Sequence, residues 1–482
     1  MKKMFMLLSV MLFAIVLTSC FADVDTLEWE TLPDSIYLQG SATLDTIADN
    51  VRIKINGTSY TLATALLLPD VTVSGFETST VGKGLITIKY KSLTIYYAYD
   101  VVGDTEVPEP VDPTYDWYVD QSSPYTLGSV SDLYGFAHIV NGSASEIARD
   151  TFAGKVVNLG VDIDLSDKVW TPIGESARKQ NAEKIFTDLG TSGVNRPQNN
   201  ETEAQYIARL NALPKTLTKY VYLGNYFFAE KISDTSYKYW QSDQALDANK
   251  FFAGTFDGQN HKITGLSDIG YTPRTAIIYA NSSKVLQGYT FGLFGVVEQN
   301  VTIKNLVLEE VTINGAYYNS GNSELVTADL DSVGAVVGYS WGTGNVTIDN
   351  IKVMSGTISA FAAVGGILGR SYTKGEVLIK NSENRANLTM DEYHAGGMIA
   401  YISGATKVTF INNTNYGNIT AKVTGNYAGA MIHSLPAGGN FTDCRNFGNI
   451  IGTNHTGLGM VGKGAGSFNF TDCVNYGTLT AK

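Results

Sequence analysis

The stretch VGAVVG at residues 333–338 returns as VGGILG at residues 364–369 and as AGGMIA at residues 395–400. Each copy begins 31 residues after the previous one, and two looser copies follow at residues 428–433 and 457–462. A fixed period shared by several copies indicates repeat units that pack on their neighbours, so we expect a solenoid.

A second landmark runs in the same phase. In every unit a short apolar run, rich in β-branched and aromatic residues, ends on an amide or carboxylate side chain, at Asn350, Asn381, Asn412, Asp443 and Asp472. These runs lack helical spacing, so each unit is predicted to consist of strands joined by turns. One unit is then one coil of roughly three short strands.

Stacked coils lie about 4.8 Å apart, which aligns equivalent side chains in columns. The Asn/Asp column can be a hydrogen-bonded ladder at a corner or a row of ligand-binding groups, and we favour the ladder because similar ladders stabilise stacked sheets. Glycine follows the landmark at Gly356, Gly417, Gly448 and Gly477. We expect a corner with positive φ there, a conformation that glycine adopts readily.

The composition and charge of the chain exclude some classes of function. The chain has 482 residues, a formal charge of −12, 49 Gly and 28 Tyr. Its length predicts roughly one to three domains, and its acidic charge disfavours a nucleic-acid partner. Its five histidines show no metal-ligand spacing, and no sequence motif pairs a nucleophile with a base. We therefore expect no metal, no cofactor and no catalytic residue.

Residues 1–20 have the pattern of an export signal. Lys2 and Lys3 precede an apolar run that is too short to span a bilayer comfortably. The ending LTSC at residues 17–20 resembles the bacterial lipobox, in which the cysteine is lipid-modified and becomes the first residue of the mature protein. The resemblance implies export and a membrane anchor at Cys20. The alternative is an ordinary signal peptide with an incidental cysteine.

Residues 21–102 are predicted to form a small all-β domain. Alternating apolar and polar residues at 51–55, 85–90 and 93–97, with an Asn-Gly turn after the first run, indicate paired strands. The phrase VSGFETSTVGKG at residues 73–84 resembles bacterial immunoglobulin-like domains of group 3. The resemblance implies a sandwich that serves as a spacer in a surface protein.

Residues 103–120 are predicted to be a semi-extended linker, because this acidic segment is rich in proline, which interrupts sheet pairing. Residues 131–140 then show an amphipathic helical pattern with Ser131 as N-cap. We expect this helix to cap the first coil of a solenoid domain that spans residues 121–482, since an open coil exposes its core.

Three further motifs precede the repeats: WTPIG at residues 170–174, FDG at 256–258 and FGLFG at 291–295. Their order, with the VGGILG units, resembles bacterial surface proteins that carry GLUG-type repeats on a right-handed parallel β-helix. The resemblance covers most of residues 125–482. It implies an all-β chain, with the immunoglobulin-like sandwich followed by the β-helix, at the cell surface in an adhesin-like role.

The chain departs from that family at residues 175–250, an insertion between the WTPIG and FDG motifs. The insertion is dense in aromatic residues, which give a large contact area with few rotatable bonds. We therefore predict candidate ligand-binding side chains there, at Tyr220, Tyr222, Tyr226, Tyr237, Tyr239 and Trp240. The alternative is that these rings pack the insertion on the coils.

Two classes of function fit this sequence. The favoured one is a non-enzymatic, lipid-anchored surface protein whose β-helix binds a glycan or a protein. The rival is a carbohydrate-active enzyme, a polysaccharide lyase or glycoside hydrolase, which needs acidic residues around the cleaved bond. Asp162 and Asp164 are the nearest candidates, but they lie in an alternating strand and match a structural turn of the family that the chain resembles.

Cys444 and Cys473 occupy the same place in neighbouring units. Their Cα atoms should lie about 4.8 Å apart, a distance that a disulfide can span. Stacked side chains point the same way, however, and a disulfide needs closer Cβ atoms. We predict two reduced, buried thiols.

Overall fold

The computed structural model describes most of the chain. The described residues are 27–175, 220–241, 250–271, 275–278, 289–315, 330–422, 427–452 and 459–480, with short gaps at 35, 92, 104–107, 109, 120–121, 225–226, 234–235, 361–362, 391–392, 436–437 and 465. Their side chains are described except at 83, 85, 96, 98, 119, 220–241, 275–278, 289, 330 and 331. The predicted all-β character is confirmed, since the described residues form long parallel sheets with few helices.

Two sheets form the N-terminal part. The first holds β1 (Leu27–Thr31), β3 (Arg52–Ile55) and β4 (Thr58–Thr61). The second holds β5 (Val71–Ser74), β6 (Gly82–Tyr90) and β7 (Leu93–Val102), with β2 (Ile36–Leu38) parallel to β7. Short helices α2 (Leu44–Ile47) and α3 (Leu62–Ala65) connect strands. Both sheets share one hydrophobic core, in which Ile53, Ile86 and Ile95 are fully buried.

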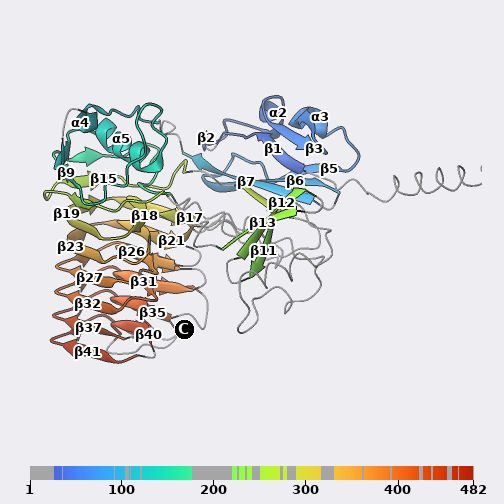
Figure 1. Ribbon diagram of the computed structural model, residues 1–482. Helices are drawn as coiled ribbons and strands as arrows, with labels where there is room; N and C mark the ends of the chain where they lie inside the picture. Colours follow the sequence, from blue (N-terminus) through green and yellow to red (C-terminus); the bar gives the residue numbers. More distant parts are fainter. Residues whose placement is uncertain are drawn as a thin grey trace, which may run out of the picture.

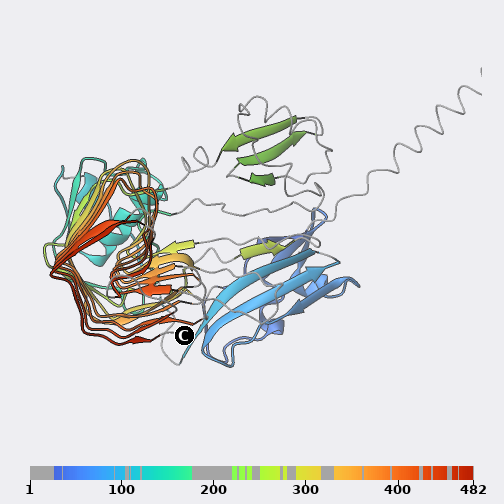
Figure 2. The ribbon, with the colours of Figure 1, turned by 90° about the horizontal axis from the view of Figure 1, so that it is seen from below.

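The C-terminal part winds into a stack of coils, which Figure 1 shows from the side and Figure 2 along the stack. The long sheet runs through β8 (Tyr125–Leu127), β9 (Val156–Leu159), β14 (Thr255–Asp257), β19 (Val301–Glu309), β23 (Val346–Val353), β27 (Glu376–Lys380), β32 (Lys407–Ile411), β37 (Gly439–Thr442) and β41 (Phe468–Thr471). Short strands continue it around a corner: β10 (Ile163–Asp164), β15 (Lys262–Thr264), β28 (Glu383–Asn384), β33 (Thr414–Asn415), β38 (Arg445–Asn446) and β42 (Val474–Asn475).

Three narrower sheets complete the coils. The second sheet holds β20 (Val311–Gly315), β24 (Gly356–Ala360), β29 (Asn387–Met390), β34 (Ile419–Ala421), β39 (Ile450–Ile451) and β43 (Leu479–Thr480). The third sheet holds β17 (Tyr289–Phe291), β21 (Leu330–Gly334), β25 (Ala363–Gly365), β30 (His394–Gly396) and β35 (Tyr427–Gly429). The fourth sheet holds β18 (Phe294–Glu298), β22 (Val337–Trp341), β26 (Leu368–Ser371), β31 (Ile399–Ile402), β36 (Ile432–Ser434) and β40 (Val461–Lys463).

A full coil contains four strands rather than the expected three. The coil that begins with β23 continues through β24, β25 and β26 before β27 starts the next one. In later coils a bend at the Asn/Asp landmark splits the first strand in two, as in β27 and β28. Strands pair parallel and in register from one coil to the next. This stacking confirms the β-solenoid that the repeat period predicts.

The landmark residues themselves have positive φ. Asn350 and Asn381 both have φ of 53°, a left-handed conformation that Asn tolerates better than most residues. The role predicted for the following glycines is wrong, because Gly356 alone among the four has positive φ (135°). A Cβ on Gly417 would lie 1.9 Å from the carbonyl oxygen of Ala386. Close contact between adjacent coils therefore requires glycine at that position.

The landmark side chains form the predicted corner ladder. Asn350 Nδ2 donates to Asn305 Oδ1 at 2.9 Å, and Asn412 Nδ2 donates to Asn381 Oδ1 at 3.1 Å. Each bond joins one coil to the next along the outer edge of the stack. The ladder is not continuous, because Asn381 Nδ2 donates to Asp349 Oδ1 rather than to Asn350, so the predicted ladder is confirmed only for part of the column.

A second amide ladder lies inside the coils and was not predicted. Asn384 Nδ2 donates to Asn415 Oδ1 at 2.9 Å, Asn415 Nδ2 to Asn446 Oδ1 at 2.8 Å, and Asn446 Nδ2 to Asn475 Oδ1 at 2.7 Å. The first three of these side chains are fully buried. The sequence did contain the signal, because each of these asparagines follows its landmark by three residues.

The first coil is covered by helix α5 (Val130–Asn141), at the upper end of the stack in Figure 1. Its N-cap is Ser129 rather than Ser131, since the Ser129 side chain accepts a hydrogen bond from the Asp132 N–H. Phe136 packs from the helix into the first coils, with its ring centroid 5.0 Å from that of Phe152 and 5.5 Å from that of Phe252.

The segment predicted to be a linker is only partly extended. It ends in the short helix α4 (Asp116–Val119), and Trp117 is buried in the same core as α5. The Trp117 ring stacks on Phe152 with a centroid distance of 6.1 Å. Burial of this large apolar ring draws the end of the segment into the solenoid.

A strand from the solenoid also joins the N-terminal sheets. Strand β16 (Thr275–Ile278) pairs antiparallel with β7, in a register that sets Thr275 opposite Tyr97. Nearby, the Gly270 N–H donates to Asp100 Oδ2 at 3.0 Å. The two parts are therefore connected by sheet pairing as well as by residues 103–120. This second connection argues against a spacer domain that is joined to the solenoid by a flexible linker alone.

The prediction that both cysteines are buried is correct for Cys444 and wrong for Cys473. Cys444 and Cys473 are both free, but Cys444 is buried whereas Cys473 is half-buried, because no described coil follows the one that contains it. A hydrogen bond from the Cys444 thiol lowers the pKa of Cys473 to about 7. The same contact, together with burial, raises the pKa of Cys444.

Candidate functional site

A continuous group of aromatic side chains lies on the outer side of the third and fourth sheets, outside the hydrophobic core of the coils. We call it the aromatic strip; it consists of Tyr339, Trp341, Tyr372, Tyr401, His394, His433 and Tyr427. None of these residues belongs to the core cluster that fills the coils. They are buried or half-buried in the outer angle between the two sheets.

Each ring of the strip contacts the next. Trp341 lies 5.8 Å from Tyr372, and Tyr372 lies 5.5 Å from Tyr401, measured between ring centroids. Tyr401 stacks on His394 at 4.9 Å with an interplanar angle of 29°. His394 in turn lies 4.4 Å from His433. The strip therefore crosses several coils without interruption.

The register of the fourth sheet explains this alignment. One outward column contains Tyr339, Arg370, Tyr401, Ser434 and Lys463, each paired with the next across adjacent strands. Four strand spacings give a column about 19 Å long. The strip is thus an elongated surface along the stack rather than a compact pocket.

Glycine lets the two sheets meet closely beneath the strip. A Cβ on Gly365 would lie 2.0 Å from the carbonyl oxygen of Leu368, and one on Gly396 would lie 1.9 Å from that of Ile399. Such distances are far below van der Waals contact, so the repeated glycine of the VGG motif is a packing requirement. Larger side chains stand on either side of this contact and form the strip.

Two histidines meet in the strip although they are far apart in the sequence. His394 Nδ1 and His433 Nδ1 lie 2.8 Å apart, so one ring donates a proton and the other accepts it. Burial lowers the pKa of His394 to about 2 and that of His433 to about 3, with further lowering from nearby Arg370 and Lys463. His433 Nε2 is buried without a hydrogen-bond partner among the described residues. Both rings are therefore neutral at ordinary pH.

This pair predicts a specific loss of stability in acid. The unfolded chain binds protons at both histidines below about pH 6.5, whereas the folded protein stays unprotonated to far lower pH. Stability should therefore fall as the pH is lowered from about 6.5, by up to about 1.4 kcal/mol per pH unit for each histidine. Thermal melting of the wild type and of a His394→Gln/His433→Gln variant between pH 7 and pH 5 measures this, and we expect a shallower decline for the variant. Equal slopes would contradict the prediction.

Five of the six candidate residues of the insertion lie in a three-stranded antiparallel sheet. It comprises β11 (Tyr220–Gly224), β12 (Phe227–Ser233) and β13 (Ser236–Gln241), drawn apart from the coils in Figure 2. The register pairs the positions of Tyr222, Phe228 and Trp240 across the three strands. Tyr220, Tyr237 and Tyr239 also lie on these strands, while Tyr226 falls outside the described residues. The side chains of all six candidates lie outside the described part, so their role stays a prediction.

The two aspartates that could have formed a catalytic pair accept structural hydrogen bonds instead, Asp162 from the next coil and Asp164 within its own turn. Asp162 Oδ1 accepts hydrogen bonds from the Lys262 N–H at 3.1 Å and lies 3.0 Å from His261 Nδ1. Asp164 Oδ1 accepts from the Ser166 N–H at 2.9 Å. These hydrogen bonds lower the pKa of both carboxyl groups. The structural interpretation of this pair is confirmed.

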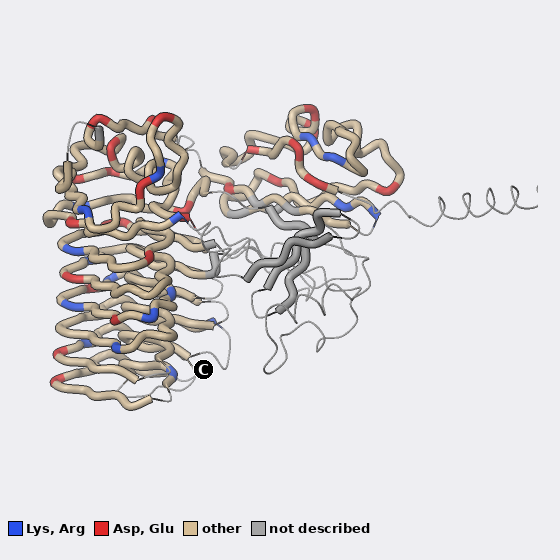
Figure 3. Tube along the Cα trace, in the orientation of Figure 1, with Lys and Arg blue, Asp and Glu red and all other residues tan. Residues whose placement is uncertain are grey.

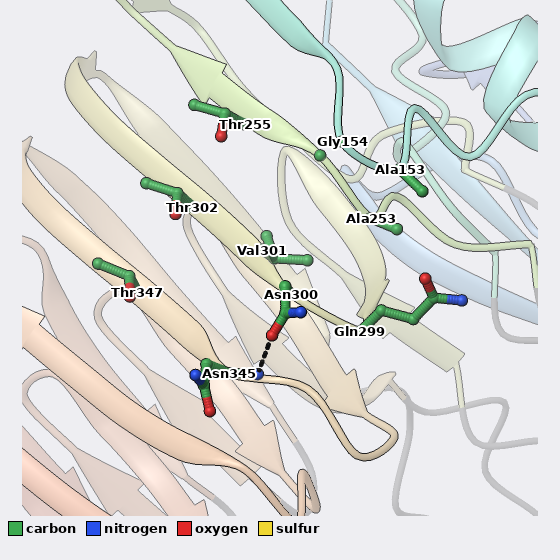
Figure 4. A pocket seen from close by; sticks show the side chains of 11 residues that line it. Ala153, Gly154, Ala253, Thr255, Gln299, Asn300, Val301, Thr302, Asn345 and Thr347 are labelled. Atoms are coloured by element: carbon green, nitrogen blue, oxygen red, sulfur yellow. Dashed lines mark hydrogen bonds between the residues drawn. The ribbon is translucent and has the colours of Figure 1, made fainter.

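A separate hollow lies on the outer face of the long sheet near the capped end of the stack (Figure 4). It has a volume of about 650 Å³, and its floor carries Thr255, Thr302 and Thr347 in register. At its rim the Asn345 N–H donates to Asn300 Oδ1 at 2.9 Å. Its lining residues include no ionisable side chain. The hollow offers hydroxyl and amide contacts but no general acid or base.

Within the described ranges, no group of three or more His, Cys, Asp or Glu side chains is placed to hold a metal ion. Nor is any helix of the described part long and apolar enough to cross a membrane. No protein-family model matches the sequence, and neither curated proteins nor solved structures give a match.

Sequence reasoning missed the strip. Its tyrosines recur only loosely with the repeat, since Tyr339, Arg370 and Tyr401 alternate aromatic and basic residues at one repeat position. The sequence did contain one signal for the strip. Each strand of the fourth sheet begins with an apolar residue, and the residue two positions later belongs to the outward column. The histidine pair left no signal, because its members lie on different sheets of neighbouring coils.

Proposed function

We propose that the protein is a cell-surface lipoprotein, anchored at Cys20, whose β-helix binds a glycan through the aromatic strip without cleaving it. The resemblance to lipobox, group 3 immunoglobulin-like and GLUG-type sequences supports the anchor, the sandwich spacer, the right-handed winding and the surface location. The observation that carries the binding proposal is the strip itself. The rings of Trp341, Tyr372 and Tyr401 lie outside the core cluster, contact one another along several coils and are only half-buried, so they provide an apolar surface on which sugar rings can stack.

The non-enzymatic part of the proposal rests on the chemistry of the described surfaces. The hollow has no ionisable lining, and the carboxylates of Asp162 and Asp164 both accept hydrogen bonds from backbone N–H groups. Glycoside hydrolysis typically needs two carboxyl groups about 5 to 10 Å apart across the scissile bond. Binding without turnover is the function that these surfaces support best.

Binding to a glycan array, followed by analysis of each bound glycan for cleavage products, tests this function. Trp341→Ala and Tyr372→Ala should each weaken binding at least about tenfold, because each removes a ring from the contact surface. Tyr476→Ala is a matched control, since that ring is 61% exposed and stacks on Phe447 at a different corner of the coil. Equal loss in the control, or release of products by the wild type, would contradict the proposal.

The lipid anchor makes its own prediction. Cys20→Ser should move the protein from the membrane fraction to the soluble fraction, because stable anchoring of an exported lipoprotein depends on acyl chains at that cysteine. Fractionation of cells that express each form measures the effect. Retention of the serine variant in the lipid fraction at full level would show that the anchor is elsewhere.

A further inference from the structure

The hollow on the long sheet gathers uncharged polar side chains. Its floor carries three threonines in register, which we call the floor threonines: Thr255, Thr302 and Thr347. In the next coil the same column continues with Leu378. At the rim, the position of Asn345 is followed one coil further by Glu376, whose N–H donates to Asn345 Oδ1 at 2.8 Å. The continuous run of uncharged polar groups therefore ends with the hollow.

The amide groups at the rim are held in place by the backbone of the following coil. Asn300 Oδ1 accepts a hydrogen bond from the Asn345 N–H at 2.9 Å (Figure 4), and Asn345 Oδ1 accepts one from the Glu376 N–H. These bonds engage the carbonyl oxygens, so each Nδ2 group is fixed at the rim with its two N–H donors. Groups that are already ordered lose little entropy when a ligand binds.

The charges beside the hollow are paired with one another. The residues two positions after the floor threonines are Asp257, Lys304 and Asp349. Lys304 Nζ lies 3.1 Å from Asp257 Oδ2, and Lys380 Nζ lies 3.1 Å from Asp349 Oδ2. Elsewhere on the coils charged residues are sparse and of both signs (Figure 3). With no ionisable lining and paired flanking charges, the hollow favours a neutral ligand over a charged one.

The hollow lies next to one end of the aromatic strip. Trp341 of the strip pairs with Glu298 across adjacent strands, and the residue after Glu298 is Gln299, which lines the hollow. One strand spacing and one residue step place the Cα atoms of Trp341 and Gln299 within about 9 Å of each other. Glu298 here and Arg370 further along the strip have opposite charges, so the strip itself selects no single sign. A chain molecule on the strip can therefore continue over this corner into the hollow.

We propose that the hollow is a subsite for uncharged sugar units of the glycan whose other units stack on the aromatic strip. This inference rests on the proposed function and specifies its ligand as a neutral polysaccharide. Sugar hydroxyl groups donate and accept hydrogen bonds, as threonine hydroxyl groups do, and the rim amides add donors. The volume of about 650 Å³ lies within the range of about 300 to 1,000 Å³ that is typical of ligand sites.

Titration calorimetry of the purified full chain with cello-, manno- and galacto-oligosaccharides, from the disaccharide to the hexasaccharide, tests the inference. We expect affinity for at least one series to rise with chain length, because a longer chain reaches both the strip and the hollow. Thr302→Val/Thr347→Val removes two hydroxyl groups and keeps the side chains similar in shape. This variant should bind the hexasaccharide at least about fivefold more weakly and should lose most of the length dependence.

Thr409→Val is the matched control. Thr409 occupies the same column two coils beyond Thr347, is half-buried as Thr347 is, and lies outside the hollow. This variant should bind the hexasaccharide as the wild type does, and all the variants should melt at the wild-type temperature. Equal weakening by Thr409→Val would overturn the assignment of the subsite to the hollow.

The remaining outcomes separate this inference from the proposed function. Unchanged binding by Thr302→Val/Thr347→Val, with weaker binding by Trp341→Ala, would overturn the subsite and leave the strip as the binding surface. Tighter binding of oligogalacturonate than of every neutral series would overturn the neutral ligand class. Weaker binding by the threonine variant but not by Trp341→Ala would contradict the role of the strip. No binding of any of these oligosaccharides or of any array glycan would overturn the proposed function as well.

Discussion

Replacement of Asn415 by Ala is expected to lower the free energy of unfolding of the C-terminal coils by about 3 to 5 kcal/mol. The Asn415 side chain is fully buried and connects three coils. It accepts from Asn384 at 2.9 Å and donates to Asn446 at 2.8 Å and to the carbonyl oxygen of Gly417 at 2.8 Å. Alanine leaves these partners buried without their bonds, and each orphaned group costs about 1 to 3 kcal/mol.

Asn418→Ala is the matched control. Asn418 lies three residues further along the same coil, is exposed, and accepts one hydrogen bond through Oδ1 from the Asn449 N–H at 2.9 Å. Water can replace that bond, so the loss should stay within about 1 kcal/mol. A solenoid can unfold in parts, so thermal melting should be combined with hydrogen exchange at β28, β33 and β38. Equal losses for the two variants would show that the inner ladder does not stabilise the stack.

The second large effect is expected at Gly366. A Cβ there would lie 2.3 Å from the carbonyl oxygen of Gly397 and 2.5 Å from Cγ of Asn384. The backbone oxygen belongs to the next coil and cannot move alone, so Gly366→Ala should force adjacent coils apart. We expect a destabilisation of about 3 kcal/mol, at the upper end of the usual range for overpacking.

Gly103→Ala serves as the comparison for this variant. The nearest atom to a Cβ on Gly103 is Cγ2 of Val81 at 3.9 Å, an ordinary contact. Its effect on the melting temperature should be close to zero.

Because the Gly366 site also touches Asn384, a Gly366→Ala/Asn415→Ala double variant should be less destabilised than the sum of the single variants. Strict additivity, or no effect of Gly366→Ala alone, would contradict this account of the VGG motif.

The repeat period decided most of what could be predicted of the fold. A 31-residue repeat of strand-forming residues leaves few ways to bury its apolar side chains other than stacking each copy on the next. The corner ladder followed from Asn and Asp at one repeat position. The assignment of positive φ to glycine failed, because Asn350 and its equivalents adopt that conformation while Gly417 is required by contact with Ala386.

The candidate site was harder to predict because its residues come together only after the coils are stacked. His394 and His433 meet across two sheets, although their separation of 39 residues does not match the repeat period. Tyr372 follows the end of β26, where the coil turns, and sequence alone does not show which way its ring lies. Aromatic density in the insertion was visible in the sequence, whereas a strip assembled from one or two rings per coil was not.

The sequence by itself determined the architecture of the C-terminal part, because strand propensity and a fixed period are local properties that repeat along the chain. Only the tertiary structure decided which outward side chains share a surface. Which side chains become neighbours depends on the register between adjacent coils, and the lengths of the connecting loops influence that register. It also decided that β16 pairs with β7, a contact between segments separated by more than 170 residues. Such pairing is set by available backbone donors and acceptors at a sheet edge, which carry no signature in the amino-acid sequence.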